Sequence, residues 1–479
     1  MQRPKVRFKG FTDDWEQRKF GELVEKYEDI VDTPTEGYTR LGIRSHAKGT
    51  FHSYVEKGKE LETAKMFRVA ANNFIVNITF GWEHAVAITD ENDAGKLVSH
   101  RFPQYSFNEG KLPEFFKYLI LDERFRHHLE LSSPGGAGRN RVLKLNDMLD
   151  YKMSFPRTAE QEKVGMYFSH LDYIITFHQR KCEQTKKLKK YMLQKMFPKE
   201  GQTVPEIRFE GFTDAWEKRK LESLCDLFTD GDWIEAKDQS NLGVRLVQTG
   251  NVGITQYLDK ENNKKWISEE KFEKLHCKEI FQGDILVSRL PEPAGRACIM
   301  PDLGTRMITA VDCTIIRTSK DCNSKYLVQY LSTPSYFKIV NSFLGGGTRQ
   351  RISRGNLSTI NIPIPVCLAE QEKIGRYFAN LDHLITLHQR KCDEIAKYQE
   401  IYVAKYVYIG AEVIKMEKII LYHGSPNKEV TPKYGLGEAR HDYGKGFYLT
   451  EDIELAKEWS VCRPDESNGW VHKYELDTN

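Results

Sequence analysis

The feature of this 479-residue chain that most constrains its fold is an internal repeat. Residues 4–23 and 205–224 are identical at 12 of 20 positions, at an offset of 201. Residues 159–182 and 369–392 are identical at 17 of 24 positions, at an offset of 210. The segments between these blocks share almost nothing. A repeat of this kind reflects a repeated structural unit, so we expect two tandem copies with a common scaffold and different middles. The two copies are either a duplicated structural unit or a pair of recognition units with separate specificities.

The end of each copy has the pattern of a long helix. Residues 159–197 contain no proline and one glycine, and their apolar residues recur at steps of three, four and seven. Thr158 and Gln161 fit a capping box at the start. A long helix with one narrow apolar stripe needs a partner, so we expect the two helices to form an intramolecular coiled-coil spacer; packing against another protein is the alternative. The expected packing residues are Phe168, Leu171, Ile175, Phe378, Leu381 and Ile385.

A basic run, 181–190, lies on the first of these helices. It forms either a solvated face or a contact with phosphate or an acidic partner.

Each middle has the pattern of a mixed α/β unit, with short apolar runs that end at glycine turns. The expected strands lie within 38–45, 73–80, 84–89, 244–253 and 283–301, and the expected helices within 115–121, 325–331 and 336–340.

Arginine and lysine collect in the expected loops of both middles. Each copy also has a glycine-rich turn followed by an R-x-R pair, within 136–142 and 346–352. Glycine lets backbone N–H groups approach phosphate closely, and arginine offers paired donors to phosphate or guanine. Most such arginines form surface ion pairs, but this pattern recurs at the same point of both copies. The candidate DNA-binding residues are Arg40, Arg44, Lys48, Arg139, Arg141, Arg245, Arg289, Arg296, Arg349 and Arg351.

The composition excludes several other classes of protein. The nine cysteines are scattered singly, without zinc-site spacing, so we expect no metal site. The chain has neither a long apolar run nor a signal-peptide pattern at its N-terminus, so we expect it to remain in the cytoplasm without membrane contact. A net charge of +3 leaves nucleic-acid binding to the local distribution of charge.

Three motifs together resemble the specificity (S) subunits of type I restriction-modification systems. They are W-E-Q-R-K-F-G-E-L and W-E-K-R-K-L near the start of each copy, G-D-I-L-V-S-R in the second middle, and the A-E-Q-E-K…H-Q-R-K-C block at the end of each copy. The resemblance covers residues 1 to about 410. It implies an α/β (α+β) fold with a pseudo-two-fold repeat, in which two target recognition domains are separated by two long antiparallel helices.

The implied domains are target recognition domains at 1–158 and 201–368 and spacer helices at 159–200 and 369–415. The resemblance implies that each recognition domain binds one half of a bipartite site in double-stranded DNA. It also implies partners: two modification subunits that methylate adenine with S-adenosylmethionine, and restriction subunits that use ATP and Mg. We expect no catalytic residue in this chain, since it contains neither an adenine-methylation tetrapeptide nor a G-x-x-x-x-G-K-[ST] loop.

Residues 416–479 do not belong to the repeat and resemble the start of an ADP-ribosyltransferase-like domain. By that resemblance His423 and Gly424 would contact the nicotinamide dinucleotide and Tyr448 would stack on the nicotinamide. The expected catalytic glutamate is not identifiable, which favours a truncated, vestigial fragment. Two alternatives to a DNA-binding specificity subunit therefore stay open: a DNA-targeted ADP-ribosyltransferase-like fusion, and an assembly scaffold with degenerate recognition domains.

Overall fold

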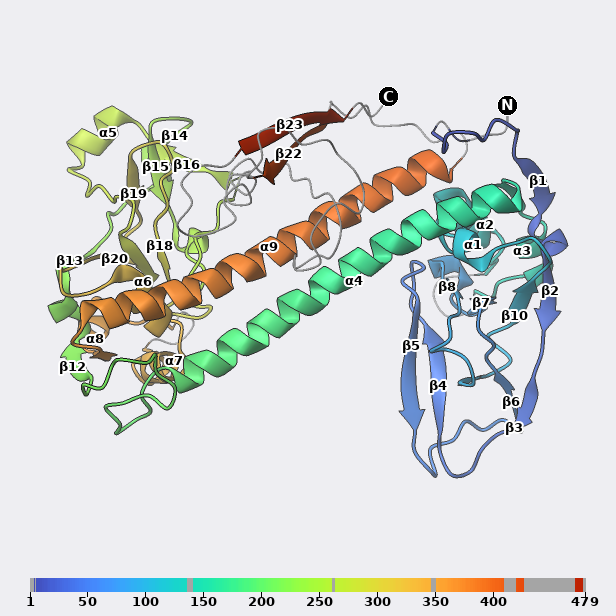
Figure 1. Ribbon diagram of the computed structural model, residues 1–479, viewed down its shortest axis with the longest axis horizontal. Coiled ribbons are helices and arrows are strands. Elements are labelled where there is room, and N and C mark those ends of the chain that lie inside the picture. The colour runs from blue at the N-terminus through green and yellow to red at the C-terminus, as the bar shows by residue number, and fades with distance from the viewer. Residues whose placement is uncertain are drawn as a thin grey trace. The chain divides into compact units, whose positions relative to one another are not determined.

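The structure is a computed structural model that describes residues 4, 6–135, 141–260, 263–345, 350–408, 419–425 and 470–476. The chain divides into two compact units (Figure 1). The first unit comprises residues 1–164 and 402–479, and the second comprises residues 165–401.

Among the described residues up to 157, the first unit contains three sheets and three short helices. The two-stranded sheet pairs β1 (Glu16–Lys19) with β11 (Lys152–Phe155). The four-stranded sheet has the order β2 (Val24–Tyr27), β10 (Gln104–Phe107), β7 (Asn73–Val76) and β8 (Val86–Ile88). The five-stranded sheet has the order β3 (Ile30–Asp32), β6 (Lys65–Arg68), β9 (Leu97–Val98), β4 (Tyr38–Ile43) and β5 (Thr50–Val55). The helices are α1 (Pro113–Leu119), α2 (Glu123–Leu131) and α3 (Leu145–Leu149).

The second unit repeats this plan. Its two-stranded sheet pairs β12 (Glu217–Lys220) with β21 (Asn361–Ile364). One four-stranded sheet has the order β13 (Cys225–Asp230), β20 (Cys313–Thr318), β17 (Ile285–Ser288) and β18 (Ala297–Ile299). The other has the order β14 (Gln239–Ser240), β16 (Lys265–Ile267), β15 (Val244–Val247) and β19 (Met307–Thr309). Its short helices are α5 (Glu269–Lys274), α6 (Ser324–Tyr330), α7 (Pro334–Ser342) and α8 (Arg354–Ser358).

The strand pairing shows that the two middles are related although their sequences are not. Among the strands that the structure describes, each unit has one parallel pair, β4 with β9 and β15 with β19. Arg40 lies opposite Leu97 in the first pair, and Arg245 lies opposite Met307 in the second. The two arginines therefore occupy the same place in the fold. Neither repeat offset aligns them, because insertions of different length separate the strands.

Two long helices, α4 (Thr158–Lys195) and α9 (Leu368–Tyr406), contain 38 and 39 residues. Within the second unit they lie side by side (Figure 1). Asp172, His178 and Lys189 of α4 contact Gln399, His388 and Asp382 of α9 in that order, so the helices are antiparallel. The predicted fold class, mixed α/β units with a long antiparallel helix pair, is confirmed.

The repeated sequence blocks form the same ion pair in both units. In the first unit Arg7 donates through Nε to Glu160 at 2.7 Å and through Nη2 at 2.5 Å. In the second unit Arg208 donates to Glu370 at 2.6 and 2.8 Å. Both glutamates are almost fully buried in the first turn of a long helix. The paired, charge-assisted hydrogen bonds hold the N-terminal arm of each copy against its helix.

The glutamine that follows each of these glutamates also makes the same contact in both units. Gln161 accepts a hydrogen bond from the backbone N–H of Leu112, and Gln371 accepts one from Asn323, both at 2.9 Å. Leu112 and Asn323 are the residues just before α1 and α6. The glutamine therefore joins the start of the long helix to the helical layer of its own unit.

Among the described residues, no helix is long and apolar enough to cross a membrane. Beyond the long helices, β22 (Ile419–Ser425) pairs antiparallel with β23 (Trp470–Leu476).

Candidate nucleic-acid interface

The hairpin of β4 and β5 presents two of the predicted DNA-binding residues to solvent. Arg44 and Lys48 are both exposed in the loop 44–49. The backbone of this loop is left-handed at His46 and Ala47, with φ of 61° and 49°. Arg44 donates through Nη1 to the carbonyl of Thr50 and lies 5.5 Å from the centroid of the Phe51 ring. The guanidinium of Arg44 therefore lies near an aromatic ring, and the same exposed loop carries the ammonium of Lys48.

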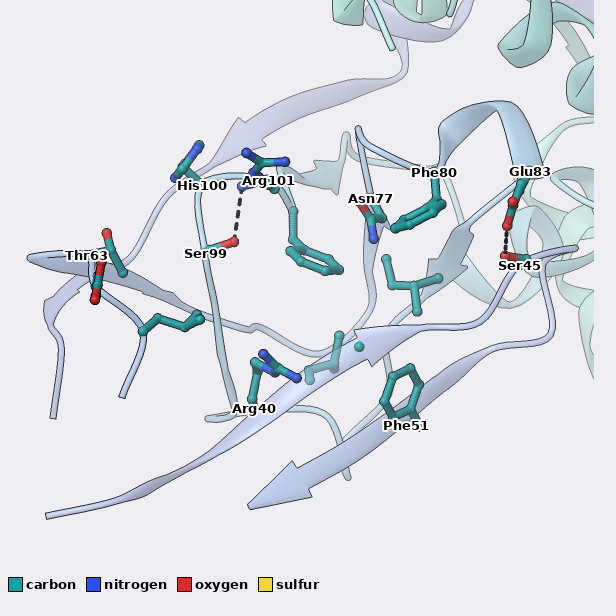
Figure 2. Close-up of a pocket in the computed structure, with 16 residues that line it drawn as sticks. Arg40, Ser45, Phe51, Thr63, Asn77, Phe80, Glu83, Ser99, His100 and Arg101 are labelled. Carbon is teal, nitrogen blue, oxygen red and sulfur yellow. Dashed lines mark hydrogen bonds between the residues drawn. The ribbon is translucent and has the colours of Figure 1, made fainter. Parts of the chain in front are cut away.

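Arg40 lies on β4 at a cavity of about 520 Å³ within the first unit (Figure 2). Sequence reasoning missed most of the other polar residues there, including Asn77, His100 and Arg101. They come from separate loops and only the tertiary fold brings them together. The one available signal is Arg101, a basic residue between two short apolar runs.

Arg141 has a partly structural environment. Its Nε donates to the carbonyl of Ser133 at 3.2 Å, and its guanidinium lies 5.4 Å from the centroid of the Trp82 ring. Arg139, its partner in the R-x-R pair, lies outside the described residues.

In the second unit, Arg245 is buried with 2% of its surface exposed. Its Nη1 donates to the carbonyl of Lys265 at 2.9 Å, and its Nη2 lies 3.5 Å from Asp259. The ring of Trp266 covers the guanidinium at 5.5 Å. The guanidinium of this arginine is therefore held inside the protein by a carbonyl group, a carboxylate and an aromatic ring.

Arg289 and Arg296 are engaged in the same way. Arg289, 7% exposed, donates to the carbonyl of Val311 at 2.6 Å. Arg296 donates to the carbonyls of Val252 at 2.7 Å and Thr249 at 2.9 Å, and burial lowers its pKa. Each guanidinium satisfies carbonyl groups that a loop would otherwise leave unpaired.

Arg351 is exposed and its Nη1 lies 3.7 Å from Asp312. Its backbone exchanges hydrogen bonds with Gly345. Arg349 lies outside the described residues.

The expected spacer residues have two different environments. Phe378 and Leu381 are buried in the core of the second unit, where the ring of Phe378 lies 5.9 Å from that of Phe197. Phe168 is fully buried, whereas three others are half-buried: Leu171, Ile175 and Ile385.

The helix pair also has a polar centre. His178 and His388 are buried, and their Nδ1 atoms lie 3.0 Å apart. Burial, together with the nearby His388 and Lys391, lowers the pKa of His178 to about 4. Cys182 and Cys392 lie beside the histidines. Within the described part of the chain, however, no group of three or more His, Cys, Asp or Glu side chains is arranged to hold a metal ion.

A buried ion pair lies farther along the same helices. The Nζ of Lys189 contacts Asp382, whose other oxygen accepts from Thr255 at 3.0 Å and from Gln329 at 2.8 Å. Burial lowers the pKa of Lys189, and Asp382 opposes that shift. The network ties both helices to a loop and to α6 of the second unit.

Of the residues suggested by the ADP-ribosyltransferase resemblance, His423 and Gly424 belong to β22, where they pair in register with His472 and Val471. Tyr448 lies outside the described residues.

Comparison with known proteins identifies relatives for most of the chain. Residues 213–397 match the model of the type I restriction modification DNA specificity domain. The type I restriction enzyme MjaVIII specificity subunit of Methanocaldococcus jannaschii is 23% identical over 404 residues, which covers 80% of this chain and 90% of that protein. The putative MjaX specificity subunit of the same organism is 22% identical over 407 residues, covering 80% and 91%.

A solved structure shares the fold. The type I restriction-modification S subunit from M. genitalium superposes with a TM-score of 0.54 at 12% identity, over 85% of this chain and 99% of that one. Residues 419–479 match a family described only as a protein of unknown function, DUF3990.

Proposed function

We propose that this chain, whose residues 213–397 form a type I restriction modification DNA specificity domain, is the subunit that recognises DNA sequence for a type I restriction-modification complex. The observation that carries the proposal is the repeated strand pairing, because it extends the domain plan of residues 213–397 to the first copy, which lies outside that matched range. The chain supplies recognition and no catalysis.

Each unit binds one half of a split DNA site. The recognition domains are residues 1–158 and 201–368, and the spacer helices are 159–200 and 369–415. A helix of 38 residues is about 57 Å long at 1.5 Å per residue. The helices therefore set the gap between the half-sites, and the different surfaces of the two middles set the bases that are recognised.

The exposed cations of each unit make the DNA contacts. In the first unit these are Arg44 and Lys48, with Arg40 at the neighbouring cavity. In the second unit Arg351 is the exposed candidate. Three other arginines, Arg245, Arg289 and Arg296, support the recognition loops from within, because each donates hydrogen bonds to the protein's own carbonyl groups. Arg139, Arg141 and Arg349 complete the proposed set through the two R-x-R pairs.

The chemistry belongs to partner subunits. Two modification subunits bind S-adenosylmethionine and methylate adenine, and restriction subunits use ATP and Mg to cleave, all in the cytoplasm. Residues 416–479 form an ADP-ribosyltransferase-like fragment without an identified catalytic glutamate and contribute nothing to this activity.

A genome-wide map of adenine methylation tests the proposal, in cells that express this chain with its cognate modification subunit. We expect one split motif, with two short specific halves around a fixed gap. Methylation that depends on the chain but follows no split motif would contradict it, and so would methylation that is unchanged when the chain is absent.

A further inference from the structure

We propose that the cavity of the first unit binds a single nucleobase that leaves the stacked duplex at the first half-site. The inference rests on the proposed function and assigns the cavity a ligand. The cavity measures about 520 Å³, which is within the usual range for small-molecule sites. Its walls combine aromatic rings with a few polar groups (Figure 2).

Phe51 forms a flat platform at the rim of this cavity. It lies opposite Gly42 in the pairing of β4 with β5. A Cβ atom at position 42 would meet the Phe51 ring at 2.3 Å, so only glycine lets the ring lie across the strand. The ring is nevertheless 40% exposed, and the Arg44 guanidinium lies nearby. An aromatic ring held on one side and open on the other is a stacking surface for a base.

The orientation of Phe51 is fixed from the opposite face of β5. The buried carboxylate of Asp93 accepts from the hydroxyl of Thr50 at 2.9 Å and contacts Nε2 of His52 at 2.7 Å. Side chains alternate along a strand, so anchoring residues 50 and 52 on one face directs residue 51 to the other. The platform is therefore preorganised before any ligand binds.

The polar groups of the cavity suit the edge of a base. Arg40 lines it, and the Arg40 side chain has no hydrogen bond or ion pair with any residue that the structure describes. Asn77 lies at the centre of the lining residues, and Arg101 and His100 lie at the far side (Figure 2). An amide and a guanidinium offer the donors and acceptors that bind base edges. The carboxylate of Glu83 already accepts a hydrogen bond from the hydroxyl of Ser45.

In the second unit a large side chain covers the arginine at the same place in the fold. Arg245, the counterpart of Arg40, lies opposite Trp266 in the sheet and beneath its ring. Arg40 lies opposite Ser53, a much smaller residue. The Ser53 hydroxyl is buried and lacks a hydrogen-bond partner in the described part of the chain. Ser53 leaves the side chain of Arg40 accessible, whereas Trp266 covers the side chain of Arg245.

The experiment uses the full chain assembled with its modification subunits and a duplex of the mapped target. The fluorescent base 2-aminopurine is placed at each position of the first half-site in turn, leaving out the methylated adenine. Its fluorescence rises when a base unstacks, and stacking on an aromatic side chain contributes enough for about a tenfold change in affinity on removal. We expect the 2-aminopurine fluorescence to change at one position. We also expect the complex to bind the duplex more tightly when the base pair at that position is mismatched.

Two variants and one control identify the cavity as the site. Phe51→Ala removes the platform, and Ser53→Trp fills the space as Trp266 does in the second unit. Both should abolish the signal at that position. Tyr54→Ala alters a 67% exposed ring on the other face of β5 and should leave it unchanged. Specific binding and methylation with no 2-aminopurine response at any position would overturn this inference alone. Absence of any sequence-specific binding would instead remove the proposed function and this inference with it.

Discussion

His178 and His388 contact each other through Nδ1 atoms 3.0 Å apart, and they occupy the same position in the two copies of the repeat. Because the helices are antiparallel, each histidine therefore contacts the equivalent histidine of the other copy. One neutral imidazole must donate the hydrogen bond and the other must accept it. The contact is compatible with neutral rings and opposed by protonation.

This pair predicts that the second unit loses stability in mild acid. The pKa of His178 falls from 6.5 to about 4 on folding, so the unfolded chain binds its proton first as the pH falls. Stability should be fully present above pH 6.5 and decline toward pH 4, by up to about 3 kcal/mol, since one pKa unit corresponds to about 1.4 kcal/mol. Urea unfolding at a series of pH values measures this. His178→Gln should flatten the dependence, whereas His170→Gln, on the exposed face of α4, should not. Identical pH profiles for all three proteins would contradict the account.

The buried pair of Lys189 and Asp382 predicts unequal effects of its two partners. Asp382→Ala leaves a buried ammonium without its counter-charge and should cost about 3–5 kcal/mol. Lys189→Gln should cost only about 1 kcal/mol. The reason is visible at the equivalent place in the repeat, where Gln399 donates to Asp172 at 2.6 Å. Free energies of unfolding in urea provide the comparison, and equal losses for the two variants would show that burial of the ammonium is unimportant.

The ion pair of Arg208 and Glu370 predicts a local effect on the N-terminal arm of the second copy. Glu370→Gln removes the charge from a bidentate pair in which the glutamate is 1% exposed on its side chain. Amide hydrogen exchange should accelerate in residues 205–212, with a loss of about 3 kcal/mol in local stability. Glu372→Gln, two residues farther along the same helix and exposed, is the matched control. Unchanged exchange in the arm would mean that the pair does not hold it.

Lys48 and Arg245 should affect DNA binding in different ways. Lys48→Ala removes an exposed charge, so affinity should fall for all sequences alike and the slope of log K against log salt should drop by about 1. Arg245→Ala should lower the stability of the second unit and leave that slope unchanged, because its donors bind the protein itself. Binding titrations over a salt series measure both. A reduced slope for the Arg245 variant would place that residue at the DNA.

The sequence predicted the long helices, the repeat and the α/β class, because these depend on periodicity and on residues that recur at fixed offsets. His178 lies on the first of these helices, and the structure buries it. The periodicity could not indicate that this position pairs with its own copy, since antiparallel register is a tertiary property.

The environments of the arginines in the two middles could not be predicted from the sequence. Arg40 and Arg245 both precede a buried leucine on equivalent strands, yet one lines a cavity and the other is sealed. The difference lies in the residue across the sheet, Ser53 or Trp266, which is far away in sequence. Burial of an arginine depends on such neighbours, so residue type alone could not separate structural arginines from exposed ones.

The most direct test of the central claim compares two maps of adenine methylation. One comes from the wild-type chain, and the other from a chain whose loop 44–49 is replaced by glycine and serine, each expressed with the modification subunit. If each unit binds its own half-site, the wild type gives a split motif, and the variant changes or relaxes one half while the other half and the gap stay the same. Simultaneous change of both halves, or of neither, would contradict the assignment of one half-site to each unit.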